Sequence, residues 1–425
     1  MHKSRKNILL IVRRHAGEVD WILPLLYRFD KKINLVTIFE NHSSFRSLSS
    51  NKKLFNLWKL RCNKYVIKDK TDNFAWKLLH KVLVLSKIKN LLDISKIEEF
   101  ILEKTFDFQK FLKKIKVTEF KAVFVTNINL SYLPIIIKKK NPNTLIVRYP
   151  ESTWIFPPRS NILSNQNKQK IYSVTGDLFL YANKDNQKFL LDDKTSNISK
   201  NRTLICGFPR YEKWWVKKFI GKKIKKDSTF KILVALRHPN KHNFQISSYK
   251  YIVKSIIETA AKFKNCKVVF KLHPHNVDYK LLRDTLSIFD KKIWSIKKEH
   301  LMVLAHSSDL CITIMTSGCF DCLALNKPTV EFFRLQYELD NSPTALKNST
   351  HYIFDKKTNK WKSTFQYFGF VENVQKQKEL ENLAKLVFFK KKKYIWKKKI
   401  NNYNKFLKSK YDSKKISKII LKNFN

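Results

Sequence analysis

Short apolar runs without polar alternation recur along the chain, and they constrain its fold more than any other feature. They lie at 7–12, 33–39, 122–127, 144–149, 177–182 and 203–207, and again at 231–236, 267–272, 292–296, 309–314 and 328–333. Stretches with helical spacing of apolar residues separate most of them. Strands that are apolar on both sides must be covered on both faces, which is typical of parallel sheets with helical crossovers. The sequence therefore predicts an α/β fold with two doubly wound, Rossmann-like domains.

The two series of runs set the expected domain boundaries. We expect residues 1–206 and 231–385 to form the two domains, with 207–230 as a linker and the usual ligand site in a cleft between them. Residues 50–118 are rich in lysine and carry apolar residues at helical spacing, which predicts a helical insertion. Residues 386–425 alternate lysines with aromatic residues and predict a basic helical tail.

The charge of the chain is strongly positive. Its 425 residues include 86 Lys and Arg against 34 Asp and Glu, a formal net charge of +52, while 43% of the residues are hydrophobic and can build a large core. Such a charge suits a nucleic acid, an anionic membrane surface or a phosphate-bearing substrate. A compositional bias toward Lys, Asn, Ile and Phe explains it equally well.

The tail bears on the membrane interpretation of this charge. Its alternating lysines and aromatic residues are suited to acidic lipid headgroups, and the alternative is a solvated helix whose aromatic side chains pack on the N-terminal domain. Because the sequence contains no recognised RNA- or DNA-binding module, we expect no specific nucleic-acid partner.

A small-residue turn follows the run at 309–314. Thr316, Ser317 and Gly318 stand where a strand gives way to a helix, so backbone N–H groups and two hydroxyls are available to a diphosphate. Asp321, one turn later, is placed to accept hydrogen bonds from ribose hydroxyls. The structural alternative is that Ser317 only caps the helix and Gly318 only permits close packing.

Cationic and imidazole side chains follow two other strands of the same series. Lys271, His273 and His275 end or follow the run at 267–272, and Arg237 and Lys241 follow the run at 231–236. Ligands bind at the carboxyl ends of parallel strands, so we expect these side chains to contact donor phosphates. A basic surface loop is the alternative for Arg237 and Lys241.

The loop after the first strand is the candidate catalytic element. It carries His15, Glu18 and Asp20, and either His15 or Glu18 could deprotonate an acceptor hydroxyl as a general base. The alternative for Glu18 is a first-turn acid that the helix dipole stabilises.

These motifs together resemble a known enzyme group. The order of strand, T-S-G-C-F-D helix and L-N-K-P strand resembles the nucleotide-binding segment of GT-B transferases, in particular the capsule polysaccharide and CDP-glycerol glycerophosphotransferase group. The segments K-L-H-P at 271–274 and G-F-P-R-Y-E-K-W at 207–214 resemble further elements of that group. The opening strand and loop are similar to bacterial surface carbohydrate biosynthesis proteins. The sequence departs from the pattern at Ile314, where the transferases have an acid.

The resemblance implies a function. It implies an acceptor-side N-terminal domain, a donor-binding C-terminal domain, and transfer of a glycosyl or glycerophosphoryl group from a nucleotide-activated donor to a polysaccharide or lipid-linked acceptor at the cell surface. It implies no cofactor and no metal. An enzyme similar to UDP-N-acetylglucosamine 2-epimerase shares the fold and is the nearest alternative. A basic nucleic-acid-binding or membrane-associated scaffold is the alternative from another class.

Two further features bear on location and redox chemistry. Arg13 and Arg14 interrupt the first apolar run, and no run is long enough to span a bilayer, so we expect a cytoplasmic protein with peripheral contact to the inner face of the membrane. Cys319 and Cys322 have C-x-x-C spacing, but they lack a thioredoxin-like context and a second ligand pair for zinc, so we interpret them as packing residues.

Overall fold

The computed structural model describes residues 6–67, 112–113, 119–127, 133–150, 176–191, 198–221, 227–239, 244–273, 279–341, 352–408 and 412–423. The chain divides into two compact units. Unit 1 comprises 1–153, 170–210 and 409–425, and unit 2 comprises 154–169 and 211–408. The chain therefore returns to unit 1 for its last helix.

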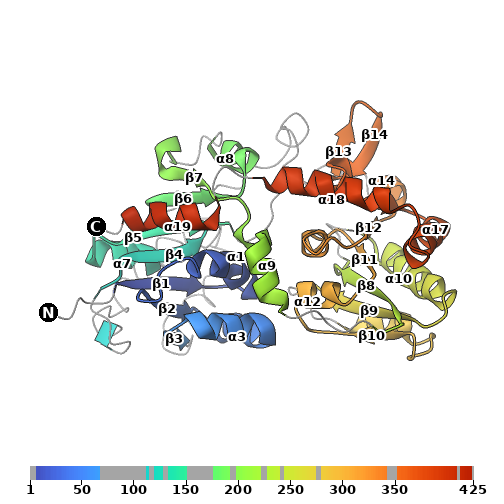
Figure 1. Cartoon of the computed structure of the whole chain (residues 1–425), viewed down its shortest axis with the longest axis horizontal. Coiled ribbons are helices and arrows are strands. Elements are labelled where there is room, and N and C mark those ends of the chain that lie inside the picture. The colour runs from blue at the N-terminus through green and yellow to red at the C-terminus, as the bar shows by residue number, and fades with distance from the viewer. Residues whose placement is uncertain are drawn as a thin grey trace, which may run out of the picture. The chain divides into compact units, whose positions relative to one another are not determined.

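Unit 1 is built on a seven-stranded sheet with the order β3-β2-β1-β4-β5-β6-β7 (Figure 1). The strands, which pair in parallel throughout, are β1 (Asn7–Val12), β2 (Asn34–Phe39), β3 (Lys64–Ile67), β4 (Ala122–Thr126), β5 (Leu145–Tyr149), β6 (Leu178–Tyr181) and β7 (Thr203–Ile205). Every residue of β1 and β4 is buried, as strands covered on both faces require.

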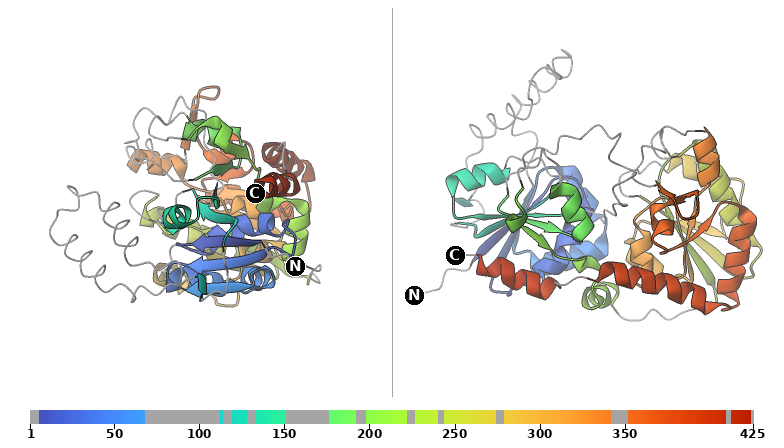
Figure 2. Two further views of the ribbon diagram at one scale, coloured as in Figure 1. Left: turned by 90° about the vertical axis from the view of Figure 1, so that its left-hand side faces the viewer. Right: turned by 90° about the horizontal axis from the view of Figure 1, so that it is seen from above.

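The helices of unit 1 occupy the connections between strands, except its last helix, which is the last element of the chain. The described ones are α1 (Ala16–Leu26), α2 (His42–Ser49), α3 (Lys52–Arg61), α7 (Leu133–Lys140), α8 (Lys184–Leu191) and α19 (Ser413–Lys422). Short 3-10 turns lie at Lys200–Arg202 and Pro209–Tyr211. The last helix, α19, lies beside α1 and buries Ile416 and Ile420 (Figure 2). Arg28 Nε donates a hydrogen bond to Ser413 Oγ at 3.0 Å and fixes the start of α19.

Unit 2 is built on a six-stranded parallel sheet with the order β10-β9-β8-β11-β12-β15. Its strands are β8 (Phe230–Leu236), β9 (Cys266–Leu272), β10 (Trp294–Ile296), β11 (Leu310–Thr313), β12 (Thr329–Phe332) and β15 (Glu372–Val374). A separate antiparallel hairpin is formed by β13 (Tyr352–Asp355) and β14 (Lys360–Ser363). Its described helices are α9 (Lys213–Ile220), α10 (Ile246–Ala261), α11 (Lys280–Leu286), α12 (Leu301–His306), α13 (Cys319–Leu323), α14 (Leu335–Asn341), α16 (Thr364–Tyr367), α17 (Gln377–Phe388) and α18 (Lys393–Leu407).

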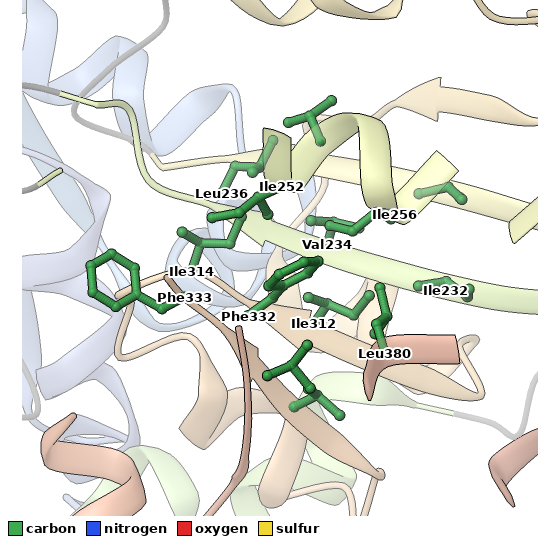
Figure 3. Packing of buried hydrophobic residues seen from close by; sticks show 14 of the residues in the cluster. Ile232, Val234, Leu236, Ile252, Ile256, Ile312, Ile314, Phe332, Phe333 and Leu380 are labelled. Carbon is green, nitrogen blue, oxygen red and sulfur yellow. The ribbon is translucent and has the colours of Figure 1, made fainter. Parts of the chain in front are cut away.

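The main apolar cluster of unit 2 lies on one face of this sheet. Figure 3 shows Ile232 and Val234 of β8, Ile312 of β11 and Phe332 of β12 packed against Ile252 and Ile256 of α10. A smaller cluster on Leu233 and Cys311 packs with Cys322 of α13. Neighbouring residues of β8 thus contribute to different clusters, so helices cover both faces of this sheet as well.

The predicted fold class is confirmed, and each predicted strand is present. The sequence analysis missed β3, β13, β14 and β15. We had assigned the residues of β3 to a helical insertion, whereas they form an edge strand whose residues are all half-buried or exposed and so lack the apolar signal of the others. Most of the predicted insertion lies outside the described residues.

Two aromatic residues of the tail do not follow the alternative in which they pack on the N-terminal domain. Trp396 and Tyr403 of α18 are buried within unit 2, where Tyr403 Oη donates to Phe320 O at 3.3 Å. The described residues contain no helix long and apolar enough to cross a membrane.

Candidate functional site

The strand order of unit 2 reverses direction between β8 and β11, and the candidate site lies at the carboxyl ends of these two strands. Arg237 directly follows β8, and the turn from Met315 to Gly318 follows β11. The Ile314 N–H donates to Ala235 O at 3.1 Å, and Arg237 Nη1 donates to Met315 O at 3.2 Å. Crevices at such reversal points are the usual ligand sites of open α/β sheets.

Two further residues of the predicted site lie at the carboxyl end of the neighbouring strand, β9. Lys271 is the next-to-last residue of that strand, and the His273 N–H donates to Leu236 O at 2.9 Å, which fixes it beside the end of β8. The fold therefore brings Arg237, Lys271 and His273 to one edge of the sheet, next to the Thr316–Gly318 turn. His275 and Lys241 lie outside the described residues.

Burial lowers the pKa of both cationic side chains at this edge. Loss of water is the main cause for Arg237 and for Lys271, and for Lys271 the nearby charge of Glu299 acts in the opposite direction. Desolvation disfavours a positive charge, and a bound anion would offset that penalty. The edge is therefore suited to a ligand with negative charge.

The turn itself has a constrained backbone. Met315 has φ of 48°, in the left-handed region that side chains other than glycine and asparagine rarely adopt. Thr316 Oγ1 accepts a hydrogen bond from the Gly318 N–H at 3.2 Å, which leaves the hydroxyl hydrogen available to a ligand. A Cβ on Gly318 would lie 2.5 Å from Leu301 Cδ2, so close packing is one reason for glycine there.

Two other predicted donor-site residues differ in accessibility. Ser317 is half-buried, whereas Asp321 is only 4% exposed. Contact between Asp321 and a ribose stays a prediction, and it requires access that the buried carboxyl does not have in this conformation.

Ile314, which replaces the acid of the resembling transferases, is fully buried. Figure 3 shows it in the apolar cluster with Leu236 and Phe333. A carboxylate at that position would have to be buried among apolar side chains, which is unfavourable without a partner. The isoleucine is thus accounted for by packing.

A buried acid that the sequence analysis missed lies close to the turn. Glu331 of β12 pairs in register with Thr313 and is 1% exposed. Its Oε2 accepts a hydrogen bond from Ser363 Oγ, and Ser363 in turn caps α16 by accepting from the Gln366 N–H at 3.1 Å. Burial raises the pKa of Glu331 to about 7 despite the hydrogen bond from Ser363. An acid in the otherwise apolar run at 328–333 was the available signal.

The hairpin β13–β14 is tied to the turn by Tyr352. The Tyr352 hydroxyl donates to Met315 Sδ at 2.7 Å, and its ring stacks on Phe333 with 5.5 Å between centroids. Burial holds the pKa of Tyr352 well above its usual value, so the phenol stays protonated and remains a donor. Tyr352 therefore fixes the strained residue of the turn.

The cysteines of this region are packing residues. Cys311, Cys319 and Cys322 are all fully buried. Burial raises the pKa of Cys319, and a hydrogen bond with Cys311 together with burial raises the pKa of Cys322, so neither is a reactive thiolate. In the described ranges, no group of three or more His, Cys, Asp or Glu side chains is arranged to hold a metal.

The candidate catalytic loop of unit 1 follows β1 and leads into α1. Glu18 is fully buried, and its two carboxylate oxygens accept hydrogen bonds from the Arg13 N–H at 3.2 Å and the Arg14 N–H at 2.6 Å. His15 Nδ1 accepts from the Gly17 N–H at 2.9 Å and caps α1, so a neutral His15 carries its proton on Nε2. Both side chains hold the loop backbone, and the role of either as a base stays a prediction.

Two arginines, of which Arg210 is half-buried and Arg148 is buried, support the same unit. Arg210 Nη1 forms an ion pair with Asp20 Oδ2 at 3.0 Å, which ties the segment after β7 to α1. Arg148, at 1% exposure, donates to Thr126 O at 3.0 Å, and burial lowers its pKa to about 9. Neither role was apparent from the sequence.

Comparison with known proteins gives a fold but no family. No protein family model matches the sequence, and no curated protein matches it. Similar solved structures include a UDP complex of MnaA from S. aureus, with 11% identity, a TM-score of 0.55, and coverage of 98% of this chain and 95% of that one.

Two other structures extend the comparison. The UDP-GlcNAc 2-epimerase from Neisseria meningitidis bound to UDP-GlcNAc has 14% identity, a TM-score of 0.56 and 98% coverage of both chains. A variant of the wall teichoic acid polymerase TagF has 11% identity, a TM-score of 0.54, and coverage of 99% of this chain and 89% of that one. At these identities the likeness establishes the GT-B-type fold.

Proposed function

We propose that this protein is a transferase that moves a glycosyl, or alternatively a glycerophosphoryl, group from a nucleotide-activated donor to a surface polysaccharide or lipid-linked acceptor. The observation that carries the proposal is the convergence of Arg237, Lys271 and His273 on the Thr316–Gly318 turn, at the point where the strand order of unit 2 reverses. The full-length likeness to enzymes named for nucleotide sugars and for a teichoic acid polymer supports it.

In the proposed reaction, this edge of unit 2 stabilises the leaving group. As the bond to the donor diphosphate breaks, negative charge grows on its oxygens. Lys271, His273 and Arg237 supply positive charge or N–H donors, and Thr316 and Ser317 supply hydroxyl donors. Donors that are fixed before the reaction cost little reorganisation, and removal of one typically slows such reactions by about 10²–10³-fold. We propose no metal in this step.

Deprotonation of the acceptor is assigned to the loop of unit 1 as a proposal only. Glu18 can act as the base if substrate binding frees an oxygen from the Arg13 or Arg14 N–H, and His15 can act if its proton shifts to Nδ1. Both routes require the loop to change its hydrogen bonds.

A UDP-N-acetylglucosamine 2-epimerase is the second candidate, and the similarity to solved epimerases favours it. An epimerase and a transferase can share the diphosphate cradle, because both cleave or rearrange bonds next to the same leaving group. They differ in what they release: an epimerase returns a nucleotide sugar of inverted configuration at C2, and a transferase releases the nucleotide only when an acceptor takes the sugar.

Binding and turnover assays test the two candidates together. The protein is titrated with UDP-GlcNAc, other UDP-, GDP- and CMP-linked sugars and CDP-glycerol in a thermal-shift assay, and the donor that binds is then incubated with and without an acceptor polymer. We expect at least one donor to stabilise the protein and the Ser317→Ala, His273→Ala double variant to lose that shift. Inverted nucleotide sugar without an acceptor would establish the epimerase, and the absence of any donor-induced shift would refute both candidates.

A further inference from the structure

The connection between α17 and α18, together with the first two residues of α18, displays four consecutive lysines between two exposed aromatic rings. Lys390, Lys391, Lys392 and Lys393 are all exposed, and the flanking rings of Phe389 and Tyr394 are 60% and 68% exposed. We call residues 389–394 the basic corner. Large aromatic side chains at such exposure are uncommon on a soluble surface, and here two of them frame a dense positive charge.

The backbone of the basic corner is folded in an unusual way. Lys390 and Lys392 have φ of 52° and 47°, in the left-handed region where glycine or asparagine is the favourable residue. Local hydrogen bonds close the turn, from the Lys391 N–H to Leu386 O at 2.8 Å and from the Lys390 N–H to Val387 O at 3.0 Å. The chain thus keeps lysine at two positions where it is conformationally costly, which points to a use for the side chains.

The residues on either side hold the basic corner in place. Phe388 packs against Phe230 and Phe263, with ring centroids 5.3 Å and 5.2 Å apart. Trp396, two residues beyond the basic corner, is buried in the main core cluster of unit 2. A surface that is fixed before binding loses less conformational entropy when it meets a partner.

Two acids that precede the basic corner along the chain are paired elsewhere. Glu381 on α17 is paired with Lys262, and Glu372 on β15 is paired with Lys399 at 2.9 Å. Both acids are therefore engaged by lysines from outside the basic corner.

A cavity of about 370 Å³ that is widely open to the surface adjoins the basic corner, and its lining is both cationic and apolar. The lysine side chains of Lys393 and Lys397 line it together with apolar groups and one amide: Trp396, Ile400, Pro328 and Asn326. Cationic groups beside an apolar wall match a molecule that carries a phosphate next to a hydrocarbon chain.

The basic corner lies at the amino ends of the strands of unit 2, whereas the candidate donor site lies at their carboxyl ends. Phe230, which contacts Phe388, is the first residue of β8, and Pro328, which lines the cavity, immediately precedes β12. Arg237 and Met315 follow the other ends of β8 and β11. A partner on the basic corner therefore leaves the donor site unobstructed.

We propose that the basic corner docks unit 2 onto a phospholipid bilayer that carries anionic headgroups. Phe389 and Tyr394 insert at the level of the headgroups, where aromatic rings are favourable, and the four lysines contact lipid phosphates. The cavity takes the phosphate and the upper acyl chain of one lipid. This docking is separate from the donor chemistry of the proposed function, so either can fail without the other.

Sedimentation with lipid vesicles tests the proposal on the full-length protein. Vesicles of pure phosphatidylcholine are compared with vesicles in which about a third of the lipid is phosphatidylglycerol, at physiological ionic strength. The test variant combines Lys390→Asn, Lys391→Gln, Lys392→Asn and Lys393→Gln, because asparagine tolerates the left-handed positions. The matched control combines Lys414→Gln, Lys415→Gln, Lys418→Gln and Lys422→Gln, four exposed lysines of α19.

We expect the wild-type protein and the α19 control to bind the anionic vesicles and the basic-corner variant to bind at least about tenfold more weakly, because each lysine near a charged bilayer adds to affinity. A second variant, Phe389→Ser with Tyr394→Ser, keeps the lysines and should still bind the anionic vesicles at low salt. It should be released from them at a lower salt concentration than the wild-type protein. Circular dichroism and the donor-induced thermal shift should be unchanged in all variants, which separates lost docking from misfolding.

Several results would overturn the proposal. These are equal binding to both vesicle types, equal losses in the basic-corner variant and the α19 control, or retention of vesicle binding by the basic-corner variant. A gel shift with single-stranded RNA that the basic-corner variant loses while its vesicle binding is unchanged would assign this surface to nucleic acid instead.

Discussion

The polar side chains at the two strand-order reversals differ in what they contact. In unit 1, the loop after β1 directs His15 and Glu18 onto its own backbone, where they accept three N–H hydrogen bonds from Gly17, Arg13 and Arg14. In unit 2, the corresponding edge gathers Arg237, Lys271 and His273 beside a turn of small hydroxyl residues. Position at the carboxyl ends of the strands therefore does not by itself give a side chain a role in the reaction. The hydrogen bonds that the side chain makes indicate whether it holds the backbone or is available to a ligand.

Two buried glutamates, Glu18 in α1 and Glu331 in β12, extend the comparison. Glu18 is satisfied by two backbone N–H groups, whereas Glu331 accepts from the Ser363 hydroxyl and has its pKa raised to about 7. Glu18 therefore holds the backbone of its loop, whereas Glu331, whose pKa burial raises to about 7, responds to pH near neutrality.

The largest expected effect is on the pH dependence contributed by Glu331. Between its ordinary pKa of 4.5 and the folded value of about 7, the folded state keeps a proton that the unfolded state has lost, so stability falls as pH rises through this range. The loss is on the order of 3 kcal/mol and is complete above about pH 7. Denaturant unfolding of wild type and Glu331→Gln at about pH 5 and about pH 8 measures it.

In that experiment the Glu331→Gln protein should lack this part of the pH slope and be the more stable of the two at the higher pH. Parallel pH profiles for the two proteins would show that Glu331 does not titrate in this range.

A smaller loss of stability is expected for Glu18→Ala. The change removes the acceptor of the Arg13 and Arg14 N–H groups, and loss of two part-buried hydrogen bonds of this kind costs about 2 kcal/mol in total. The measurement is the free energy of unfolding, with the donor affinity of unit 2 as an internal control that should not change. If Glu18→Ala folds with wild-type stability and yet loses all turnover, Glu18 acts in catalysis rather than in holding the loop.

The smallest effect is expected for His15→Ala. Loss of an N-cap acceptor destabilises a helix by about 1 kcal/mol, and His15→Asn should restore most of it because asparagine is a favourable cap. Unfolding of the three proteins, compared under one condition, gives the difference. Equal stability of His15→Ala and wild type, together with lost activity that His15→Asn does not restore, would reassign His15 to the reaction.

Sequence reasoning reached most of the fold because each buried strand carries its own apolar signal. Runs such as 7–12 and 231–236 are buried almost throughout, and they were recognised with boundaries within about two residues. Two of the strands it missed lack this signal: Lys64–Ile67 is half-buried or exposed at a sheet edge, and Glu372–Val374 has three residues. Such segments owe their conformation to the neighbouring strand.

The candidate site was predictable only in part. The sequence shows where each buried strand ends, and the carboxyl ends of parallel strands lie together. These two facts predict the positions of Arg237, Lys271 and His273. The hydrogen bonds of Glu18, the contact of Tyr352 with Met315 and the pairing of Glu331 with Ser363 depend on side-chain direction and on chain segments far apart in sequence. No local pattern encodes them.

The most direct test of the account is calorimetric titration of the donor identified by thermal shift, carried out on wild type, on the Ser317→Ala, His273→Ala double variant and on His15→Ala. We expect the double variant to bind at least about tenfold more weakly, equivalent to about 1.4 kcal/mol, and His15→Ala to bind as wild type does. Undiminished binding by the double variant would contradict the placement of the donor site at the carboxyl edge of unit 2.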